Sequence, residues 1–156
     1  WRRVVASPAP MRIIELRVIQ RLLDAGVVTI AVGGGGIPVA RDADGDLRGI
    51  PAVIDKDLAS ALLANQVGAD LLLISTAVEK VALHFGTPEQ RWVDHLTLDD
   101  VKQYLAEGIH FAEGSMAPKM RAVVQFLEAG GTEALITDPP HLEAAMAGET
   151  GTRIVR

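Results

Sequence analysis

Short apolar runs alternate along this chain with longer stretches whose apolar residues recur at about the 3.6-residue period of an α-helix. Two of the runs, residues 27–32 and 71–76, carry no charged residue. Continuous apolar runs of this length are typical of parallel strands that are buried on both faces at the centre of a sheet. Their alternation with helices predicts an α/β fold, a three-layer αβα sandwich in which helices cover both faces of a mainly parallel sheet.

Glycines mark where the predicted helices end. A glycine just past a helix adopts the left-handed conformation that satisfies the last carbonyl groups, and each of five helical stretches is followed by one. The predicted helices span residues 11–25, 56–67, 98–107, 116–129 and 140–147. The predicted strands span residues 27–32, 71–76, 134–137 and 153–155. Asp44-Gly45 predicts a hairpin turn, and residues 85–91 are predicted to form an exposed loop. Because no linker is visible, we expect a single domain over residues 1–156.

The composition excludes several classes of protein. Cysteine is absent, which rules out disulfides and thiolate metal sites. The net charge is −5 and only six residues are aromatic, so the basic face and stacking aromatics of a nucleic-acid-binding protein are lacking. The longest uncharged stretch, residues 25–40, is shorter than the roughly 20 apolar residues of a membrane span, and no secretory leader is visible. We therefore expect a cytoplasmic protein with no nucleic-acid or membrane partner.

Three common ligand-binding motifs are absent from the sequence. The run Gly33–Gly36 follows a predicted strand, but Pro38 and Val39 stand where a dinucleotide-binding fold needs its third glycine. No Gly-Lys pair exists, so the common ATP-binding P-loop is absent. The acidic stretch 42–46 begins like a calcium loop, but Leu47 replaces the glycine that such a loop requires. The four histidines show no metal-ligand spacing, so no metal-binding residue is predicted.

Two of the four lysines stand where helix electrostatics disfavours them. Lys56 and Lys119 fall in the first turns of predicted helices, where the partial positive charge of the N-terminus disfavours a lysine by up to about 1 kcal/mol. Asp55 and Ser115 are the predicted N-caps of these helices, and Pro118 lies in the first turn of the second helix. A bound anion would offset the unfavourable charge, and helix N-termini, glycine-rich loops and lysines all bind phosphate.

These features converge on one edge of the predicted sheet. In a parallel α/β sheet, the loops after the strands and the N-termini of the following helices gather at the same edge, so the glycine run and the loop after residues 71–76 meet the lysines there. The sequence therefore predicts an anion site, with phosphate as its ligand. Other interpretations stay open at this point: each lysine alone can point into solvent, Asp55 and Asp57 can be only a cap and a dipole-favoured acid, and the glycines can mark only a tight turn.

Five segments of the chain resemble the carbamate kinases of the amino acid kinase family. They are Gly33-Gly-Gly-Gly-Ile-Pro38, residues 47–60 with the motif Ile-Asp-Lys-Asp, Thr76-Ala-Val-Glu-Lys-Val81, Gly114-Ser-Met-Ala-Pro-Lys119 and Gly151-Thr-Arg-Ile-Val155. The resemblance covers essentially the whole chain. The Ile-Asp-Lys-Asp and Gly-Ser-Met-x-Pro-Lys motifs are its specific parts, because other amino acid kinases share the fold but not this pair. The resemblance implies the nucleotide-binding half of the amino acid kinase fold.

The resemblance also implies an activity of arginine metabolism, the reversible transfer of the γ-phosphoryl group of ATP to carbamate to give ADP and carbamoyl phosphate. Its small-molecule substrates would be these four compounds, with Mg²⁺ present and a homodimer as the full-length enzyme. Lys56 and Lys119 would reach the transferring phosphate and Asp57 would position the lysines. The other residues that the resemblance places around the phosphates and the nucleotide are Gly33, Gly34, Gly35, Gly36, Asp55, Ser75, Thr76, Ala77, Val78, Ser115, Met116 and Pro118. Phosphoryl transfer needs charge neutralisation and in-line positioning more than a covalent nucleophile, which suits this set.

Two departures from the family pattern qualify these expectations. His84 stands where the pattern has asparagine or tyrosine, and carbamate kinases are much longer than this chain. Their amino-terminal half supplies another glycine-rich loop, a further lysine and most of the carbamate site. Because the chain also begins at Trp1 rather than methionine, we expect it to be the carboxy-terminal half of such an enzyme, inactive or nearly so by itself. Two alternatives are another amino acid kinase with a different acceptor and a non-catalytic nucleotide-binding module.

Overall fold

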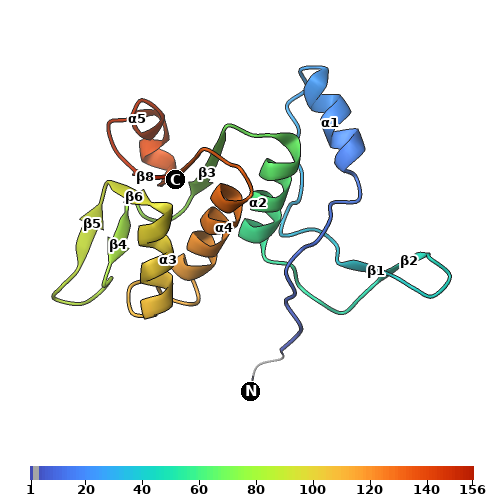
Figure 1. The fold of residues 1–156 in the computed structure, drawn as a ribbon, viewed down its shortest axis with the longest axis horizontal. Coiled ribbons are helices and arrows are strands. Elements are labelled where there is room, and N and C mark those ends of the chain that lie inside the picture. Colours follow the sequence, from blue (N-terminus) through green and yellow to red (C-terminus); the bar gives the residue numbers. More distant parts are fainter. Residues whose placement is uncertain (2–3) are drawn as a thin grey trace.

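The computed structural model describes residue 1 and residues 4–156. Its helices are α1 (Leu16–Asp24), α2 (Lys56–Val67), α3 (Leu98–Glu107), α4 (Met116–Glu128) and α5 (Leu142–Met146), with a 3₁₀ turn, η1 (Pro139–His141), directly before α5. Its strands are β1 (Val39–Arg41), β2 (Leu47–Gly49), β3 (Leu71–Ser75), β4 (Val81–Leu83), β5 (Arg91–Val93), β6 (His95–Thr97), β7 (Glu133–Thr137) and β8 (Thr152–Val155). Figure 1 shows α2 and α4 side by side in the middle of the molecule, with the β1–β2 and β4–β5 hairpins extending on opposite sides.

The main sheet contains four strands in the order β3-β7-β8-β6. β3 pairs with β7 in parallel, as β6 does with β8, whereas β7 and β8 are antiparallel. The other strands form two antiparallel hairpins, β1–β2 and β4–β5. The mainly parallel sheet and the hairpin turn predicted at Asp44-Gly45 are therefore confirmed.

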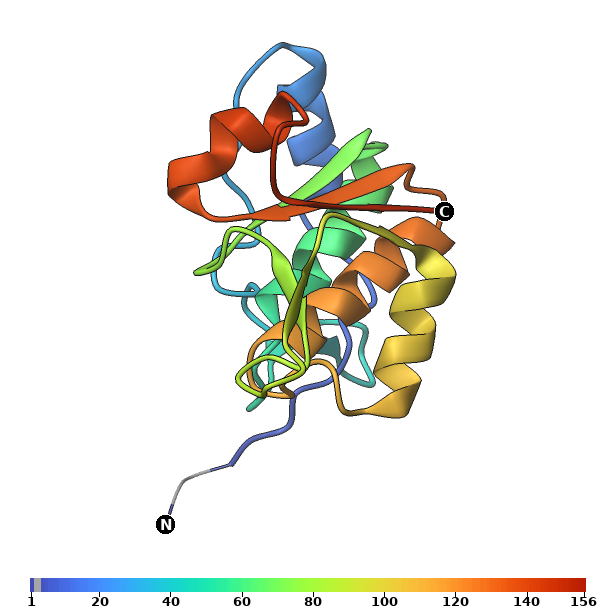
Figure 2. The same cartoon turned by 90° about the vertical axis from the view of Figure 1, so that its left-hand side faces the viewer.

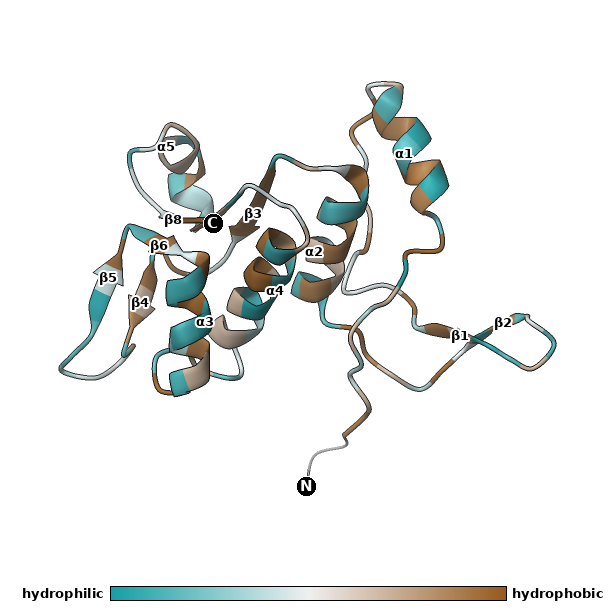
Figure 3. Ribbon diagram, viewed as in Figure 1, coloured by the Kyte–Doolittle hydropathy of each residue, from teal (hydrophilic) through white to brown (hydrophobic). Residues whose placement is uncertain are grey.

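Helices lie on both faces of the main sheet, which confirms the predicted α/β fold. Figure 2 shows α2, α3 and α4 on one face and α5 across the other. The side chains of β7 divide between the two faces. Ala134 and Ile136 belong to the core shared with α2 and α4, whereas Leu135 lies beside Gly151, which also adjoins Ala145 of α5. Figure 3 shows that β3 is hydrophobic along its length, as expected for a strand that faces this core.

The helix predictions agree best with the structure where local capping is strong. α2 and α3 have the predicted bounds because each begins at a side-chain cap, Asp55 or Thr97, and ends at a glycine with a φ of 70°, Gly68 or Gly108. α4 ends one residue earlier than predicted.

The first and last helices are shorter than predicted. α1 begins at Leu16 rather than at residue 11. Met11 is 90% exposed, so the start of the predicted stretch gains no packing that would stabilise a helical turn there. The helix predicted over residues 140–147 begins as the η1 turn, in which Pro139 and Pro140 offer no N–H groups, and continues as α5.

The strand predicted at residues 27–32 is wrong. The chain there has no strand, and Val28 and Ile30 are 93% and 97% exposed. A strand forms where a neighbouring strand satisfies its backbone groups, and among residue 1 and residues 4–156 no strand pairs with this run. As a result, β3 lies at the edge of the main sheet rather than at its centre.

Three short strands lack a sequence signal. β4, β5 and β6 contain three residues each, too few for a period of two to be recognised. The loop predicted at residues 85–91 lies in the connection between β4 and β5 except for Arg91, which begins β5, and most of the loop is exposed as expected.

The hydrophobic core lies between the main sheet and the helices α2, α3 and α4. Val123 and Phe126 of α4 are fully buried in it, together with Ala61 of α2 and Val101 of α3. In the part of the chain that the structure describes, no helix has both the length and the apolar character needed to cross a lipid bilayer. The core thus joins the helices whose N-termini carry the predicted phosphate-binding residues.

Candidate functional site

The N-terminus of α2 is capped as the sequence predicts. Asp55 has an extended conformation, and its carboxylate accepts hydrogen bonds from the N–H groups of Asp57 at 2.8 Å and Leu58 at 3.1 Å. Because Asp55 satisfies these two donors, the following residues begin a regular helix at Lys56. Lys56 and Asp57 thereby occupy the first turn of the helix.

The glycine run packs directly against this helix start. Gly35 is buried with a φ of +116°, and a Cβ atom at this position would overlap the carbonyl oxygen of Ile54 and lie 2.8 Å from its carbonyl carbon. Only glycine permits both the backbone conformation and the close approach. Among the described residues, the N–H groups of Gly34 and Gly36 donate to no protein oxygen. The run therefore offers free backbone donors beside the N-terminus of α2.

One carboxylate oxygen of Asp57 lies close to the ammonium groups of two lysines. Lys119 Nζ of α4 donates a hydrogen bond to Asp57 Oδ2 at 2.9 Å, and Lys56 Nζ lies 3.8 Å from the same oxygen. The side chains of Asp57 and Lys119 are 11% and 12% exposed, whereas that of Lys56 is 60% exposed. Two ammonium groups thus share one carboxylate where two helix N-termini meet, which leaves an excess positive charge open to solvent on the Lys56 side.

The N-terminus of α4 differs from the prediction in its cap. Ser115 occupies the N-cap position, but its φ of −145° and ψ of −72° are atypical and its hydroxyl makes no capping hydrogen bond. The N–H groups of Ser115 and Ala117 instead donate to the carbonyl oxygen of Ala112, both at 3.1 Å. Met116 and Pro118 are half-buried in the first turn of the helix. The Ser115 hydroxyl is exposed beside the helix that carries Lys119.

The remaining predicted residues lie at the carboxyl end of β3. Ser75 is the last residue of the strand and is exposed, and the N–H of Thr76 donates to the carbonyl oxygen of Thr137 at 2.8 Å. Ala77 is exposed and Val78 is half-buried in the connection to β4. Contacts thus join the two lysines to Asp57 across two helices, and they join the glycine run to Ile54, the residue before the N-cap. Residues 75–78 make no direct polar contact with the lysines, with Asp57 or with the glycine run.

A cluster of rings adjoins the loop before α4. His84 has a φ of +53°, and its ring lies 4.2 Å, centroid to centroid, from the ring of His110. His110 is buried, its Nε2 atom lies 2.5 Å from Glu107 Oε2, and its Nδ1 atom has no hydrogen-bond partner among the described residues. The hydrogen bonds from Gln103 and His110 lower the pKa of Glu107. Across residue 1 and residues 4–156, no group of three or more metal-ligating side chains is arranged to hold a metal ion.

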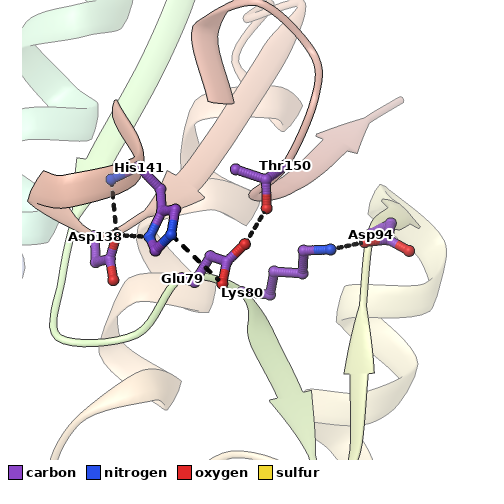
Figure 4. Close-up of polar contacts among 6 residues, drawn as sticks. All are labelled: Glu79, Lys80, Asp94, Asp138, His141 and Thr150. Carbon is purple, nitrogen blue, oxygen red and sulfur yellow. Dashed lines mark hydrogen bonds and ion pairs between the residues drawn. The ribbon is translucent and has the colours of Figure 1, made fainter. Parts of the chain in front are cut away.

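A second polar cluster, which the sequence does not predict, lies next to residues 75–78. Glu79 and Lys80 follow those residues directly, and their partners come from distant parts of the chain, as Figure 4 shows. Thr150 donates a hydrogen bond to Glu79, and Lys80 Nζ donates to Asp94 Oδ1 at 2.6 Å. No residue spacing could have revealed these pairs, because 71 positions separate Glu79 from Thr150.

Comparison with known proteins identifies the family of the chain. The model of the amino acid kinase family matches residues 2–138. The chain belongs to the amino acid kinase family. It is 52% identical over its whole length to the carbamate kinase-like protein YahI of Escherichia coli and 48% identical over 99% of its length to a carbamate kinase of Thermoplasma volcanium. It covers 49% and 50% of those proteins, so the chain spans about half the length of the curated relatives it matches.

Solved structures of carbamate kinases share the fold of this chain. A carbamate kinase from Giardia lamblia bound to AMP-PNP superimposes with a TM-score of 0.90 and 40% sequence identity, over 96% of this chain and 46% of that one. The resemblance to carbamate kinases and the amino acid kinase fold, both inferred from the sequence, are therefore confirmed. The AMP-PNP in that structure identifies a nucleotide-binding relative with this fold.

The close approach of Gly35 to Ile54 gives a direct test of how the site is built. Gly35→Ala should destabilise the protein by about 1–3 kcal/mol, because the new Cβ atom strains the backbone and collides with a carbonyl group. Gly34→Ala is the matched control, since its φ is not positive and no atom lies within 4 Å of the added Cβ, and it should change stability by less than about 0.5 kcal/mol. Urea denaturation of both variants measures the difference, and equal stabilities would contradict the packing described.

Proposed function

We propose that the chain is the nucleotide-binding part of a carbamate kinase, an enzyme that transfers a phosphoryl group reversibly between ATP and carbamate. The observation that carries this proposal is the carboxylate of Asp57, which Lys119 and Lys56 approach together at the N-termini of α4 and α2. The family membership supports the phosphotransfer class, and relatives that are 43–48% identical bear the name carbamate kinase.

The proposed roles follow from charge. In the transition state of phosphoryl transfer, negative charge spreads over the oxygens of the transferring group, and positioned cations stabilise that charge. Lys56 and Lys119 are the cations in this proposal, and Asp57 is the group that orients both ammonium groups. Mg²⁺ would enter with ATP, since Mg²⁺ binds chiefly to phosphate oxygens and water. The donors of Gly34 and Gly36, beside the start of α2, would face the phosphates.

The nucleotide itself would lie between the end of β3 and the start of α4. The carboxyl end of a parallel strand is the usual ligand-binding edge of such a sheet. At this end lie Ser75, the last residue of β3, and the residues that follow it, Thr76, Ala77 and Val78. Ser115 precedes the helix that carries Lys119, and Met116 and Pro118 lie in its first turn. The exposed hydroxyl of Ser115, which caps no helix, would be free to donate to the nucleotide.

We further propose that residues 1–156 form one domain, the carboxy-terminal half of the enzyme. Val28 and Ile30 of the apolar run at residues 27–32 are almost fully exposed, and no described strand pairs with the outer edge of β3. Both features are explained if strands from the rest of the protein complete the sheet. The acceptor site, most of a homodimer interface and the full activity would then belong to the complete protein, which we expect in the cytoplasm, and the isolated half would be inactive.

A second candidate function is phosphoryl transfer to a different acceptor. Two relatives from Escherichia coli that are each 52% identical to this chain, YahI and YqeA, are named carbamate kinase-like proteins. The residues proposed here handle the nucleotide and the transferring phosphate rather than the acceptor, so they are compatible with either acceptor. A module that binds nucleotide without catalysis is the third possibility.

The assay of the reverse reaction separates these candidates. The full-length protein, given carbamoyl phosphate and ADP, should form ATP, detected through a coupled hexokinase reaction. ATP formation from another acyl phosphate, such as acetyl phosphate, but not from carbamoyl phosphate would favour the second candidate. Nucleotide binding without any ATP formation at saturating substrates would identify a binding module and contradict the kinase proposal.

The two lysines are tested by substitution. Lys56→Ala and Lys119→Ala should each lower kcat by about 10²-fold or more, because each removes a cation from the transferring phosphate. Lys102→Ala is the matched control, since Lys102 forms only an exposed ion pair with Glu128 and should leave kcat unchanged. Circular dichroism would verify that all three variants fold. Unchanged kcat in both test variants would assign Lys56 and Lys119 to structural or solvent-facing roles.

The proposal that the sheet is incomplete is tested by hydrogen exchange. Amides of residues 27–32 should exchange rapidly in the isolated chain, because no described strand pairs with them. In the full-length protein the same amides should be protected to the level of β7, which is paired on both sides here. Mass spectrometry of peptic peptides measures both, with the peptide covering β7 as the internal reference. Rapid exchange of residues 27–32 in both proteins would contradict the proposal.

A further inference from the structure

Side chains from three separate segments meet beside the connection between β3 and β4. Glu79 lies in that connection, Asp138 and His141 follow β7, and Thr150 precedes β8 (Figure 4). β3 and β7 are parallel neighbours in the main sheet, so the segments that follow them leave the same edge. The segment at the end of β3 is the one proposed to border the nucleotide.

Glu79 is the centre of this cluster. One carboxylate oxygen, Oε1, accepts a hydrogen bond from the hydroxyl of Thr150. The other, Oε2, lies 3.9 Å from His141 Nε2. The second ring nitrogen of His141 lies 2.6 Å from Asp138 Oδ1, and this carboxylate also accepts the His141 N–H at 3.1 Å. The imidazole therefore lies between two carboxylates, and Glu79 links the connection after β3 to two other segments.

The next residues of the connection are anchored by a second threonine. The N–H of Val81 donates to Thr152 Oγ1 at 2.8 Å, and this hydroxyl donates to the carbonyl oxygen of Val93 at 2.5 Å. Val81 and Thr152 are fully buried. Thr150 and Thr152, on either side of Gly151, thus tie Glu79 and Val81 to the start of β8.

Residues 76–78 lie between two anchored points. At one end, the N–H of Thr76 donates to Thr137 of β7, and at the other, Glu79 is held by Thr150 and His141. Ala77 and Val78 form no described hydrogen bond of their own, so these two ends determine their position. We infer that Glu79 is a positioning residue for the nucleotide: through its bond to Thr150, it holds residues 76–78 in the conformation that binds the nucleotide. The inference rests on the proposed function.

The hydrogen bond should matter more than the ion pair. His141 and Glu79 are both substantially exposed and 3.9 Å apart, and exposed ion pairs contribute little. Glu79→Ala in the full-length protein should therefore raise the KM for ADP by about threefold to tenfold, the value of one hydrogen bond, with kcat changed by less than about twofold. Glu79→Gln should restore most of the wild-type KM, because its amide oxygen still accepts from Thr150.

Substitution of the partner completes the test. Thr150→Val should raise the KM for ADP as Glu79→Ala does, Thr150→Ser should not, and the double variant Glu79→Ala/Thr150→Val should be no worse than either single variant. Lys80→Met is the control from the same connection, because the described partner of Lys80 is the exposed Asp94, and the KM of this variant should stay at the wild-type value. Thermal unfolding verifies that each variant is folded.

The outcomes distinguish this inference from the proposed function. An unchanged KM for ADP in Glu79→Ala, or a failure of Glu79→Gln to restore it, overturns the positioning role while the kinase proposal stands. If the wild-type protein forms no ATP but binds ADP in calorimetry, the kinase proposal fails. The role of Glu79 is then decided by the dissociation constants for ADP, which should rise in Glu79→Ala and stay near the wild-type value in Glu79→Gln. If the wild-type protein binds no ADP at all, both fail.

Discussion

The packing of α2 against α4 is the constraint on which the rest of this structure depends. Small residues make it possible: Ala61 and Ala64 of α2 and Ala117 and Ala122 of α4 are buried in the common core, where their short side chains let two helices approach closely. The same packing brings two positive helix ends together and places one carboxylate between two lysines. The core and the candidate site are therefore consequences of one interface.

Local signals explain which parts of the fold are predictable from sequence. The bounds of α2 and α3 follow from side chains and glycines within a few residues of each end, and the structure reproduces them. The run at residues 27–32 has an equally strong local signal, but a strand depends on a partner elsewhere. With no partner strand among the described residues, its apolar character leaves exposed side chains rather than a buried strand. Burial is a property of the whole sheet, which a local pattern cannot report.

The candidate site likewise combines features that the sequence reveals with features that only the fold reveals. Lys56 and Lys119 are recognisable from sequence because each opposes the charge of its own helix end, a conflict within one turn. The bond that joins Lys119 to Asp57 connects residues 62 positions apart, and only the fold could reveal it. Ser115 shows the reverse case: it stands at the right position for a cap, yet its backbone conformation prevents the hydrogen bond. The Glu79 cluster, assembled from three segments, has no linear pattern at all.

The contact between Lys119 and Asp57 has a further consequence for how the site would receive its substrate. A lysine side chain in solvent samples many rotamers, and ordering it costs up to about 2 kcal/mol. Here the carboxylate oxygen of Asp57 acts as a resident anion that keeps the Lys119 ammonium group in place before any phosphate arrives. An incoming phosphate would meet a cation that is already oriented, so little of its binding energy would be lost to reorganisation. Asp57 would thus serve as a template for the ligand as well as a counter-ion.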